Sequence, residues 1–174
     1  MIELVLGGAR SGKSRYAENY ATEFNGEVLY LATAFPGDEE MAARIKRHVG
    51  GRPVHWKTIE EPVRLASTLL ENDGAGKLFL VDCLTLWLSN ILFSDAEIAN
   101  EQRFEHEKTE LFAVLPSLKA DILMVSNEVG QGIVPLNAMS RRFVDEAGWL
   151  HQKLAKMSDR VTFVTAGLPQ KLKG

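Results

Sequence analysis

The stretch Gly7-Gly8-Ala9-Arg10-Ser11-Gly12-Lys13-Ser14 decides the fold of this chain. Its spacing, G-x-x-x-x-G-K-[ST], is that of a phosphate-binding loop, and it lies between an apolar run, Ile2 to Leu6, and a helix-like stretch, Ser14 to Phe24. In a strand–loop–helix context, glycines allow backbone N–H groups to surround phosphate oxygens, and the helix N-terminus adds its positive end. A Gly-rich turn without a ligand is the alternative reading of the same residues. Because every position of the pattern matches, the sequence predicts a nucleoside triphosphate site.

Three side chains near this loop have predicted roles in binding a triphosphate and its metal ion. Lys13 is expected to reach the β- and γ-phosphates, and the Ser14 hydroxyl to coordinate Mg²⁺. The apolar run Leu78 to Val81 ends in Asp82, and phosphate-loop enzymes hold Mg²⁺ with the loop Ser/Thr and an Asp at such a strand end. Mg²⁺ keeps several waters, so one carboxylate and phosphate oxygens suffice. The alternative for Asp82 is a cap on the following helix without a metal role.

The bulk composition is that of one globular domain spanning residues 1–174, with 45% hydrophobic and 25% charged residues. The formal net charge of −3 disfavours nucleic acid as the main partner. The single cysteine, Cys83, excludes an intramolecular disulfide and suits a reducing, cytoplasmic location, where a buried structural role is expected. The longest apolar-rich stretch, Leu78 to Phe93, is interrupted by polar residues. We therefore expect it to form core or subunit interface rather than a membrane span.

Strand-like and helix-like patterns alternate along the chain, which predicts an α/β fold with a mostly parallel sheet flanked by helices. Several strands are nearly all apolar, as expected when helices cover both faces of a sheet. Because ligands bind outside the carboxyl ends of such strands, the residues just past those ends are the candidates for a site. The expected strands are Ile2–Leu6, Val28–Thr33, Val54–Thr58, Leu78–Asp82, Ile122–Ser126 and Arg160–Thr165; the expected helices are Lys13–Phe24, Asp38–Val49, Pro62–Asn72, Glu101–Leu115 and Ser140–Met157.

A charged segment, Asp38 to Pro53, carries carboxylates first and cations last. A surface helix whose charges complement its own dipole explains this order without any ligand. However, Arg44 and His48 are four residues apart and so share a helix face, and Arg52 follows two glycines that allow close approach to a phosphate. Neighbouring cations keep a histidine neutral at neutral pH, and a neutral imidazole can attack phosphorus to give a phosphoramidate. At this point both the surface helix and a nucleophilic His48 remain open.

Several motifs taken in order give the chain a resemblance to a known family. The most specific pair is R-I-x-x-H-x-x-x-R-P at residues 44–53 and N-E-V-G-x-G-I-V-P at 127–135. The others are G-G-A-R-S-G-K-S-R at 7–15, L-Y-L-A-T-A at 29–34, G-R-P-V-H-W-K-T-I-E at 51–60, L-V-D-C-L-T at 80–85 and V-T-A-G-L at 164–168. Over essentially its whole length, the chain resembles the bifunctional adenosylcobinamide kinases / adenosylcobinamide-phosphate guanylyltransferases of cobalamin biosynthesis.

The resemblance implies two reactions. A nucleoside triphosphate, ATP or GTP, phosphorylates the aminopropanol hydroxyl of adenosylcobinamide. GTP then donates GMP through an enzyme–histidine intermediate, which gives adenosylcobinamide-GDP and pyrophosphate. Carried over by position, the resemblance assigns the covalent role to His48. It also implies a phosphate-loop fold of the recombinase-like type and a homotrimer.

The resemblance further implies which residues contact nucleotide. Members often carry Glu where this chain has Asp82, whose carboxylate is one methylene shorter. The implied set is Gly7, Gly8, Ala9, Arg10, Ser11, Gly12, Lys13, Ser14, Ala32, Thr33, Ala34, Val49, Gly50, Gly51, Arg52, Glu60 and Asp82.

Two further segments keep alternative interpretations. The loop Asn127–Pro135 either faces the nucleotide or corrinoid, with Glu128 orienting a hydroxyl, or is purely structural. The apolar stretch Leu84 to Phe93 packs either between subunits or within the core.

Two rival functions share the phosphate loop. A plain small-molecule kinase would form no covalent nucleotide. A recombinase-like ATPase or binding module would carry a basic nucleic-acid face, which the net charge of −3 does not favour.

Overall fold

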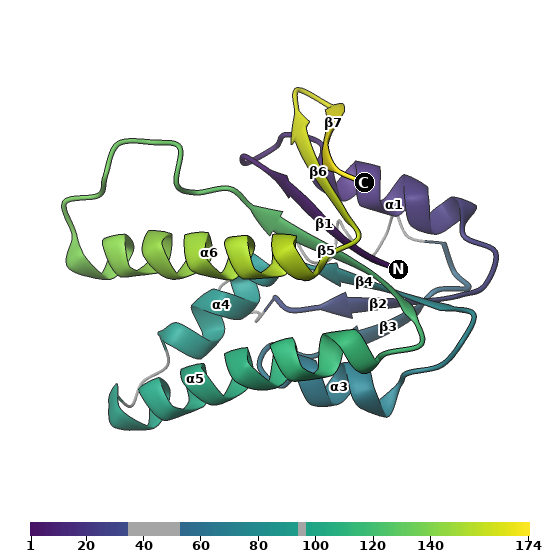
Figure 1. The fold of residues 1–174 in the computed structure, drawn as a ribbon, viewed down its shortest axis with the longest axis horizontal. Coiled ribbons are helices and arrows are strands. Elements are labelled where there is room, and N and C mark those ends of the chain that lie inside the picture. The colour runs from purple at the N-terminus through teal and green to yellow at the C-terminus, as the bar shows by residue number, and fades with distance from the viewer. Residues whose placement is uncertain (35–52, 94–96) are drawn as a thin grey trace.

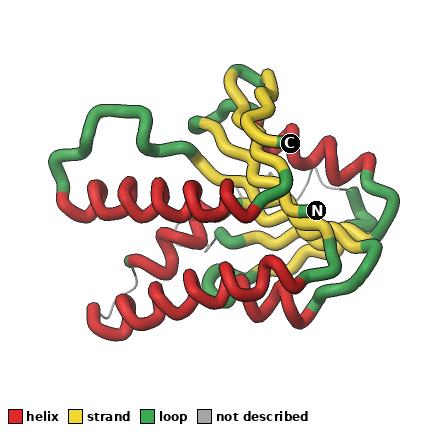
Figure 2. The backbone as a smooth tube through the Cα atoms, viewed as in Figure 1, coloured by secondary structure: helices red, strands yellow, loops and turns green. Residues whose placement is uncertain are grey.

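The computed structural model describes residues 1–34, 53–93 and 97–174. Its centre is a seven-stranded sheet with the order β3-β2-β4-β5-β1-β6-β7, in which all neighbours are parallel except the antiparallel pair β6 and β7. The strands are β1 (Ile2–Gly7), β2 (Glu27–Ala32), β3 (Lys57–Glu60), β4 (Lys77–Asp82), β5 (Asp121–Asn127), β6 (Arg160–Thr165) and β7 (Leu168–Lys173). Figures 1 and 2 show the sheet between its helices.

The described helices divide between the two faces of the sheet (Figure 1). The helix α1 packs on one face, with Ala17 and Ala21 buried against Tyr30 and Leu80. The opposite face is covered by the other four helices, whose apolar residues form one cluster with Phe79. These helices are α3 (Leu65–Glu71), α4 (Leu84–Leu92), α5 (Glu97–Val114) and α6 (Ala138–Met157), while α1 spans Lys13–Glu23 and a short 3-10 turn spans Leu115–Ser117. The predicted α/β fold with a mostly parallel, helix-flanked sheet is confirmed.

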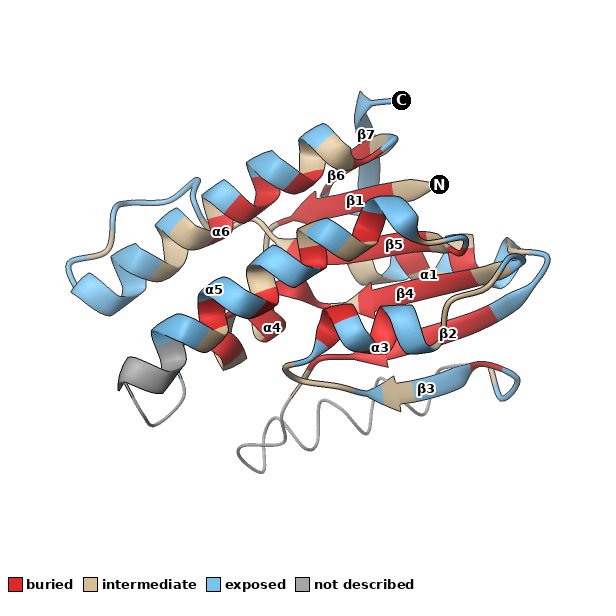
Figure 3. Ribbon diagram, turned by 60° about the horizontal axis from the view of Figure 1, so that its bottom comes forward, coloured by how far each residue is buried: buried red, intermediate tan, exposed pale blue. Residues whose placement is uncertain are grey.

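The central strands are buried on both faces because helices cover both, whereas the edge strands are open to solvent (Figure 3). All residues of β7 are exposed, and its apolar residues do not form a continuous run. No sequence pattern therefore predicts β7. This strand pairs with β6 after a tight turn at Ala166 and Gly167, which both have positive φ. The predicted strand Val54–Thr58 is shifted, because a turn precedes β3 and the strand runs Lys57–Glu60.

The apolar stretch after Asp82 forms a helix of the chain's own core. In α4, the side chains of Leu84, Trp87, Leu88 and Ile91 are fully or almost fully buried. The Trp87 indole also donates a hydrogen bond to the Val63 carbonyl oxygen at 2.7 Å, which satisfies its polar atom. Of the two interpretations of this stretch, packing within the chain is the one that the structure shows. In the described parts of the chain, no helix is long and apolar enough to cross a membrane.

The strand register brings the carboxyl ends of the six parallel strands to one edge of the sheet. Gly7 at the end of β1 pairs with Asn127 at the end of β5, and Ala32 pairs with both Asp82 and Glu60. One strand, β5, lies between the strand that leads into the loop 7–14 and the strand that ends at Asp82. The residues that sequence spacing selects thus lie along one edge, where ligands of open α/β sheets bind.

Candidate nucleotide-binding site

The loop between β1 and α1 is held by close backbone packing at its glycines. A Cβ atom on Gly7 would lie 2.5 Å from the Val164 carbonyl oxygen, so only glycine fits there. Gly12 has φ +97°, a left-handed conformation that a larger residue adopts only with strain, and a Cβ there would lie 3.0 Å from Gly167 Cα. The space available around Gly7 and Gly12 therefore explains why the motif has glycine at both positions.

Neighbouring loops hold this loop through their backbone groups. The Gly167 N–H, past the end of β6, donates to the Ser11 carbonyl oxygen at 2.7 Å. On the other side, the Glu128 N–H, past the end of β5, donates to the Gly7 carbonyl oxygen at 3.0 Å. The position of the loop is thus fixed by backbone hydrogen bonds from both strands that flank β1.

Lys13 is the most buried charged group at this edge, with 7% of its surface exposed. Its ammonium donates to the Gly8 carbonyl oxygen at 3.1 Å and so lies back across the loop. Burial lowers the pKa of Lys13 from its ordinary value, and the nearby Cys83 and Asp82 act in the opposite direction. An ammonium that has lost part of its hydration interacts more strongly with a phosphate than an exposed one does.

The N-terminus of α1 begins directly after the loop and offers free backbone donors. Gly12 occupies the N-cap position without a side-chain cap, and the first turn carries no acidic residue. The first N–H groups of a helix have no partner within it, and the helix dipole favours an anion there. Ser14, in this first turn, is partly exposed. Loop, lysine and helix end together present backbone donors and positive charge of the kind that can accept the phosphates of a nucleotide.

Asp82 lies at the end of β4 and its carboxylate is oriented by a tyrosine. The buried Tyr30 hydroxyl donates to Asp82 Oδ2 at 2.8 Å. The carboxylate is close enough to Lys13 to affect the pKa of its ammonium. The described residues contain no group of three or more His, Cys, Asp or Glu side chains able to hold a metal. A hydroxyl from Ser14 and a carboxylate from Asp82 are hard oxygen donors, which fits a cation that takes its other ligands from phosphate and water.

Comparison with known proteins identifies the family. Residues 3–172 match the family described as cobinamide kinase / cobinamide phosphate guanyltransferase. A Pseudomonas aeruginosa protein, bifunctional adenosylcobalamin biosynthesis protein CobP, is 54% identical over 174 residues, covering 100% of this chain and 98% of the relative. The Salmonella typhimurium protein named bifunctional adenosylcobalamin biosynthesis protein CobU is 40% identical over 182 residues, covering 99% of this chain and 100% of the relative. The chain belongs to this family.

As a member of the cobinamide kinase / guanyltransferase family, the chain is an enzyme with both activities, which confirms the resemblance. A solved structure from Pyrococcus horikoshii OT3 has a TM-score of 0.57 and 8% identity, and the match covers 99% of this chain and 86% of that one. At this identity the likeness concerns the fold alone, and it agrees with the α/β architecture.

The stretch Ala32 to Ala34, which the family resemblance links to guanine nucleotide, is tied into the sheet edge. The Thr33 hydroxyl donates to the Cys83 carbonyl oxygen at 2.6 Å and accepts from the Cys83 N–H at 2.8 Å. The Thr33 carbonyl oxygen accepts a hydrogen bond from Asn90 at 2.8 Å. Thr33 is fully buried, so its role here is to join the ends of β2 and β4. Ala34 is partly exposed, and Glu60 is exposed at the end of β3.

Cys83 has the structural role that the sequence predicts. It is buried, and burial, reinforced by the Asp82 carboxylate, raises the pKa of its thiol to about 11. The thiolate is the reactive form of cysteine, so this residue is inert at neutral pH.

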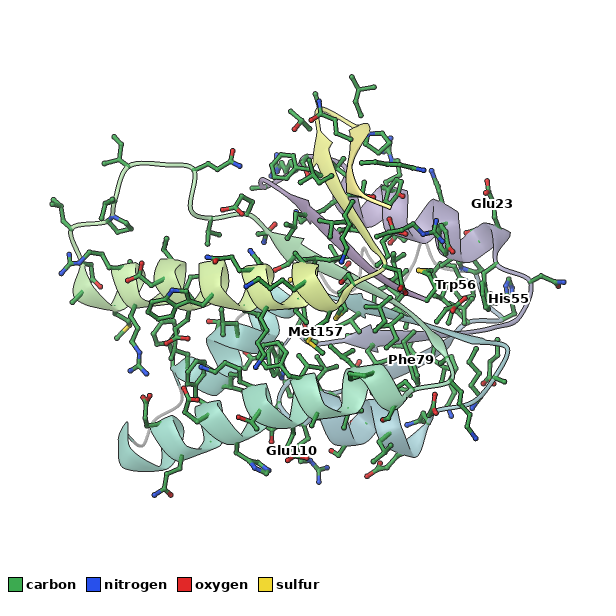
Figure 4. All side chains as sticks on the ribbon, viewed as in Figure 1. Glu23, His55, Trp56, Phe79, Glu110 and Met157 are labelled. Atoms are coloured by element: carbon green, nitrogen blue, oxygen red, sulfur yellow. The ribbon has the colours of Figure 1, made fainter. Side chains whose placement is uncertain are left out.

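The basic part of the candidate site lies outside the described residues. This applies to the predicted helix Asp38–Val49 and to His48, Val49, Gly50, Gly51 and Arg52. The nearest described histidine in sequence, His55, lies before β3 and therefore at the amino edge of the sheet. Figure 4 shows His55 and Trp56 on the same side of the molecule as Glu23, the last residue of α1. His55 is thus remote from the phosphate loop.

Sequence analysis did not predict the residues whose hydrogen bonds hold the side chains and backbone of the site in place. Tyr30 holds Asp82, Asn90 holds Thr33, and His151 contacts Ser126 at the end of β5. Each comes from a different element. Tyr30 lies within the motif at residues 29–34, but nothing in that motif indicates what its hydroxyl contacts, and Asn90 and His151 belong to none of the motifs. In the pair formed by His151 and Ser126, only Ser126 carried a sequence signal, because it lies at the end of an apolar run.

Proposed function

We propose that the guanylyltransferase reaction of this enzyme proceeds through a phosphoramidate on His48. An imidazole nitrogen attacks the α-phosphorus of GTP, a nitrogen–phosphorus bond forms, and pyrophosphate leaves. A phosphate oxygen of adenosylcobinamide phosphate then attacks the same phosphorus and releases the histidine. The support is the R-I-x-x-H-x-x-x-R-P element at residues 44–53, in a chain that belongs to the family.

The proposal that the phosphate loop binds the triphosphate in this enzyme rests on one observation, the partly dehydrated Lys13 ammonium inside a loop fixed by backbone bonds. Phosphoryl transfer depends mainly on positioning and on stabilising charge at the phosphate oxygens. The loop N–H groups and the N-terminus of α1 would orient the phosphates. Lys13 would leave the Gly8 carbonyl oxygen and pair with them. Ala34, Glu60 and the segment 49–52 are proposed to contact the rest of the nucleotide, as the family resemblance implies.

For the metal we propose Mg²⁺, held by the Ser14 hydroxyl and by the Asp82 oxygen that Tyr30 leaves free. When bound, Mg²⁺ neutralises charge on the phosphate oxygens. The hydrogen bond from Tyr30 to Asp82 would keep the other carboxylate oxygen turned toward the metal, a supporting role that residues around metal ligands commonly have.

For the working form of the enzyme we propose a cytoplasmic homotrimer that acts as a single domain and uses ATP or GTP in the kinase step. Among the described residues, several large apolar side chains lie exposed around the start of α6, with Ile133 and Leu136 at 98% and 99%. Exposed apolar side chains in one region often mark a contact surface, which supports an assembly of subunits.

The deciding experiment labels the protein with GTP carrying radioactive phosphorus at the α position. We expect the wild type and His55→Ala to retain an acid-labile, base-stable label, and His48→Ala to retain none. His55→Ala is a matched control because it removes an exposed histidine seven positions away in the sequence, at the edge of the sheet opposite the phosphate loop. A label on His48→Ala would refute the assignment, and an unlabelled wild type would favour direct transfer of GMP without a covalent enzyme intermediate.

A further inference from the structure

A chain of buried polar side chains joins the end of β5, the start of α4 and the inner face of α6. Thr85 Oγ1 and Ser126 Oγ lie 3.1 Å apart, and Ser126 Oγ and His151 Nε2 lie 2.7 Å apart. On its other side, His151 Nδ1 lies 3.8 Å from Glu128 Oε2. Thr85, Ser126 and His151 are all less than 10% exposed. A buried polar chain of this length costs free energy unless every member is hydrogen-bonded, so its order of donors and acceptors matters.

One arrangement of protons gives each hydroxyl in this chain an acceptor. The Asn127 N–H donates to Thr85 Oγ1 at 2.6 Å, so the Thr85 proton is available to Ser126. The Ser126 proton then goes to His151 Nε2, which leaves the ring proton on Nδ1, facing Glu128. Burial lowers the pKa of His151, and Glu128 opposes this shift, which is consistent with a neutral ring. The network thus ends on an N–H aimed at a carboxylate.

Glu128 is the exposed end of this network and lies beside the phosphate loop. Its Oε1 accepts a hydrogen bond from the Gly130 N–H at 2.6 Å, and its own N–H is bonded to the Gly7 carbonyl oxygen. Its side chain is 22% exposed, so a substrate can reach it. Because β5 lies between β1 and β4, the chain at residue 128 leaves the sheet edge between the strand that leads into the phosphate loop and the strand that ends at Asp82.

We propose that Glu128 accepts the proton of the substrate alcohol in the kinase reaction, and that His151 is the residue that positions it. This inference rests on the proposed function of the phosphate loop. The alcohol oxygen forms a bond to the γ-phosphorus, the bond from that phosphorus to the β–γ bridging oxygen breaks, and the nucleoside diphosphate leaves. The hydroxyl proton passes to Glu128 and from there to solvent.

The chemistry of the nucleophiles explains why only this step needs such a carboxylate. The alcohol carries a proton on the atom that attacks, and that proton must be lost. A neutral imidazole attacks with the lone pair of a nitrogen that has no proton. The phosphate oxygen of the phosphorylated substrate is likewise already deprotonated near neutral pH. A base beside the phosphate loop therefore has a task in phosphorylation and none in enzyme guanylylation.

The test compares kinase turnover with guanylylation of the enzyme in the same variants. For Glu128→Gln we expect kcat of the kinase step to fall by about 10² to 10⁴-fold, with little change in KM for adenosylcobinamide. His151→Gln keeps an amide near the Ser126 hydroxyl but loses the N–H toward Glu128, so we expect a kinase loss of up to about 100-fold. His151→Asn, which places an N–H closer to the Nδ1 position, should recover part of that loss. Labelling with α-labelled GTP should be unchanged in all three.

A matched glycine pair tests the position of the carboxylate without touching either side chain. A Cβ on Gly130 would lie 3.0 Å from Glu128 Oε1, whereas a Cβ on Gly132 would meet nothing within 4 Å. Gly130→Ala should therefore lower the kinase kcat, and Gly132→Ala should leave it unchanged. Thermal unfolding of each variant shows whether it is folded.

Three results would overturn the inference. They are a full kinase rate in Glu128→Gln, equal losses of kinase and labelling in that variant, or equal effects of the two glycine substitutions. Failure of the wild type to become labelled would instead refute the His48 proposal, and the kinase comparison would still decide the role of Glu128.

Discussion

The loops that follow β1 and β5 leave the sheet from neighbouring strands, yet they are built differently. Residues 8–12 turn tightly and are held by backbone bonds, such as that from the Gly167 N–H to Ser11. Residues 128–137 extend away from the sheet (Figure 1) and present exposed apolar side chains. Their polar tethers are mainly side-chain contacts, for example from Arg141 to the Pro135 carbonyl oxygen at 3.0 Å.

This difference indicates a division of labour at the site. A loop fixed by its backbone offers N–H groups whose positions depend little on side-chain chemistry, as binding a phosphate common to every nucleotide requires. A loop fixed by side chains can place one carboxylate and adapt the rest to a particular substrate. Substitutions in the first loop should thus affect both reactions, and substitutions in the second should separate them.

The largest effect on the two reactions together is expected for Lys13→Ala. The backbone cradle should persist, but the charge that stabilises the phosphates is lost, so both kinase turnover and enzyme guanylylation should fall by about 10² to 10³-fold. Initial rates of the two reactions measure this, with thermal unfolding as a check on folding. If one reaction kept its full rate, the two reactions would not share this loop.

A smaller effect, on the free energy of unfolding, should distinguish the two loops, because their glycines differ in the space around them. Gly7→Ala brings a Cβ within 2.5 Å of the Val164 carbonyl oxygen, and this backbone atom cannot move away cheaply. We expect the free energy of unfolding to drop by about 1 to 3 kcal/mol. Gly132→Ala, in open space, should change it by less than about 0.5 kcal/mol. Urea unfolding measures both, and equal values would contradict the contrast between the loops.

The sequence predicted the first loop well because its chemistry is local. The spacing from Gly7 to Ser14 fixes the turn, the lysine and the helix start within eight residues, and the apolar run before it fixes the strand. The position of the candidate site at one edge of the sheet also followed from the apolar runs, because the carboxyl ends of parallel strands lie at the same edge. Asp82 was found by the same rule.

The remaining parts of the site depend on contacts between residues far apart in the sequence. Nothing near Ser126 indicates that His151, on a helix 25 positions later, reaches its hydroxyl. The strand pattern likewise placed Thr33 at a ligand-facing strand end, whereas its hydroxyl is used by the Cys83 backbone. The bounds of helix α4 were not predicted, because the stretch from Leu84 to Leu92 is a short, mostly apolar run that periodicity alone does not assign to a helix or a strand.

The smallest expected effect concerns Asp82, which, like Glu128, is a carboxylate held by a side chain. Tyr30→Phe removes the hydroxyl that donates to Asp82 Oδ2 and leaves the ring in the core. If side-chain contacts position the carboxylates of this edge, the Mg²⁺ concentration at half-maximal kinase rate should rise by about 10-fold. Tyr16→Phe is the matched control, because its hydroxyl donates to Glu3 near the amino end of β1. A Mg²⁺ titration of both variants decides the matter, since equal curves would mean that Asp82 keeps its orientation without Tyr30 or takes no part in binding the metal.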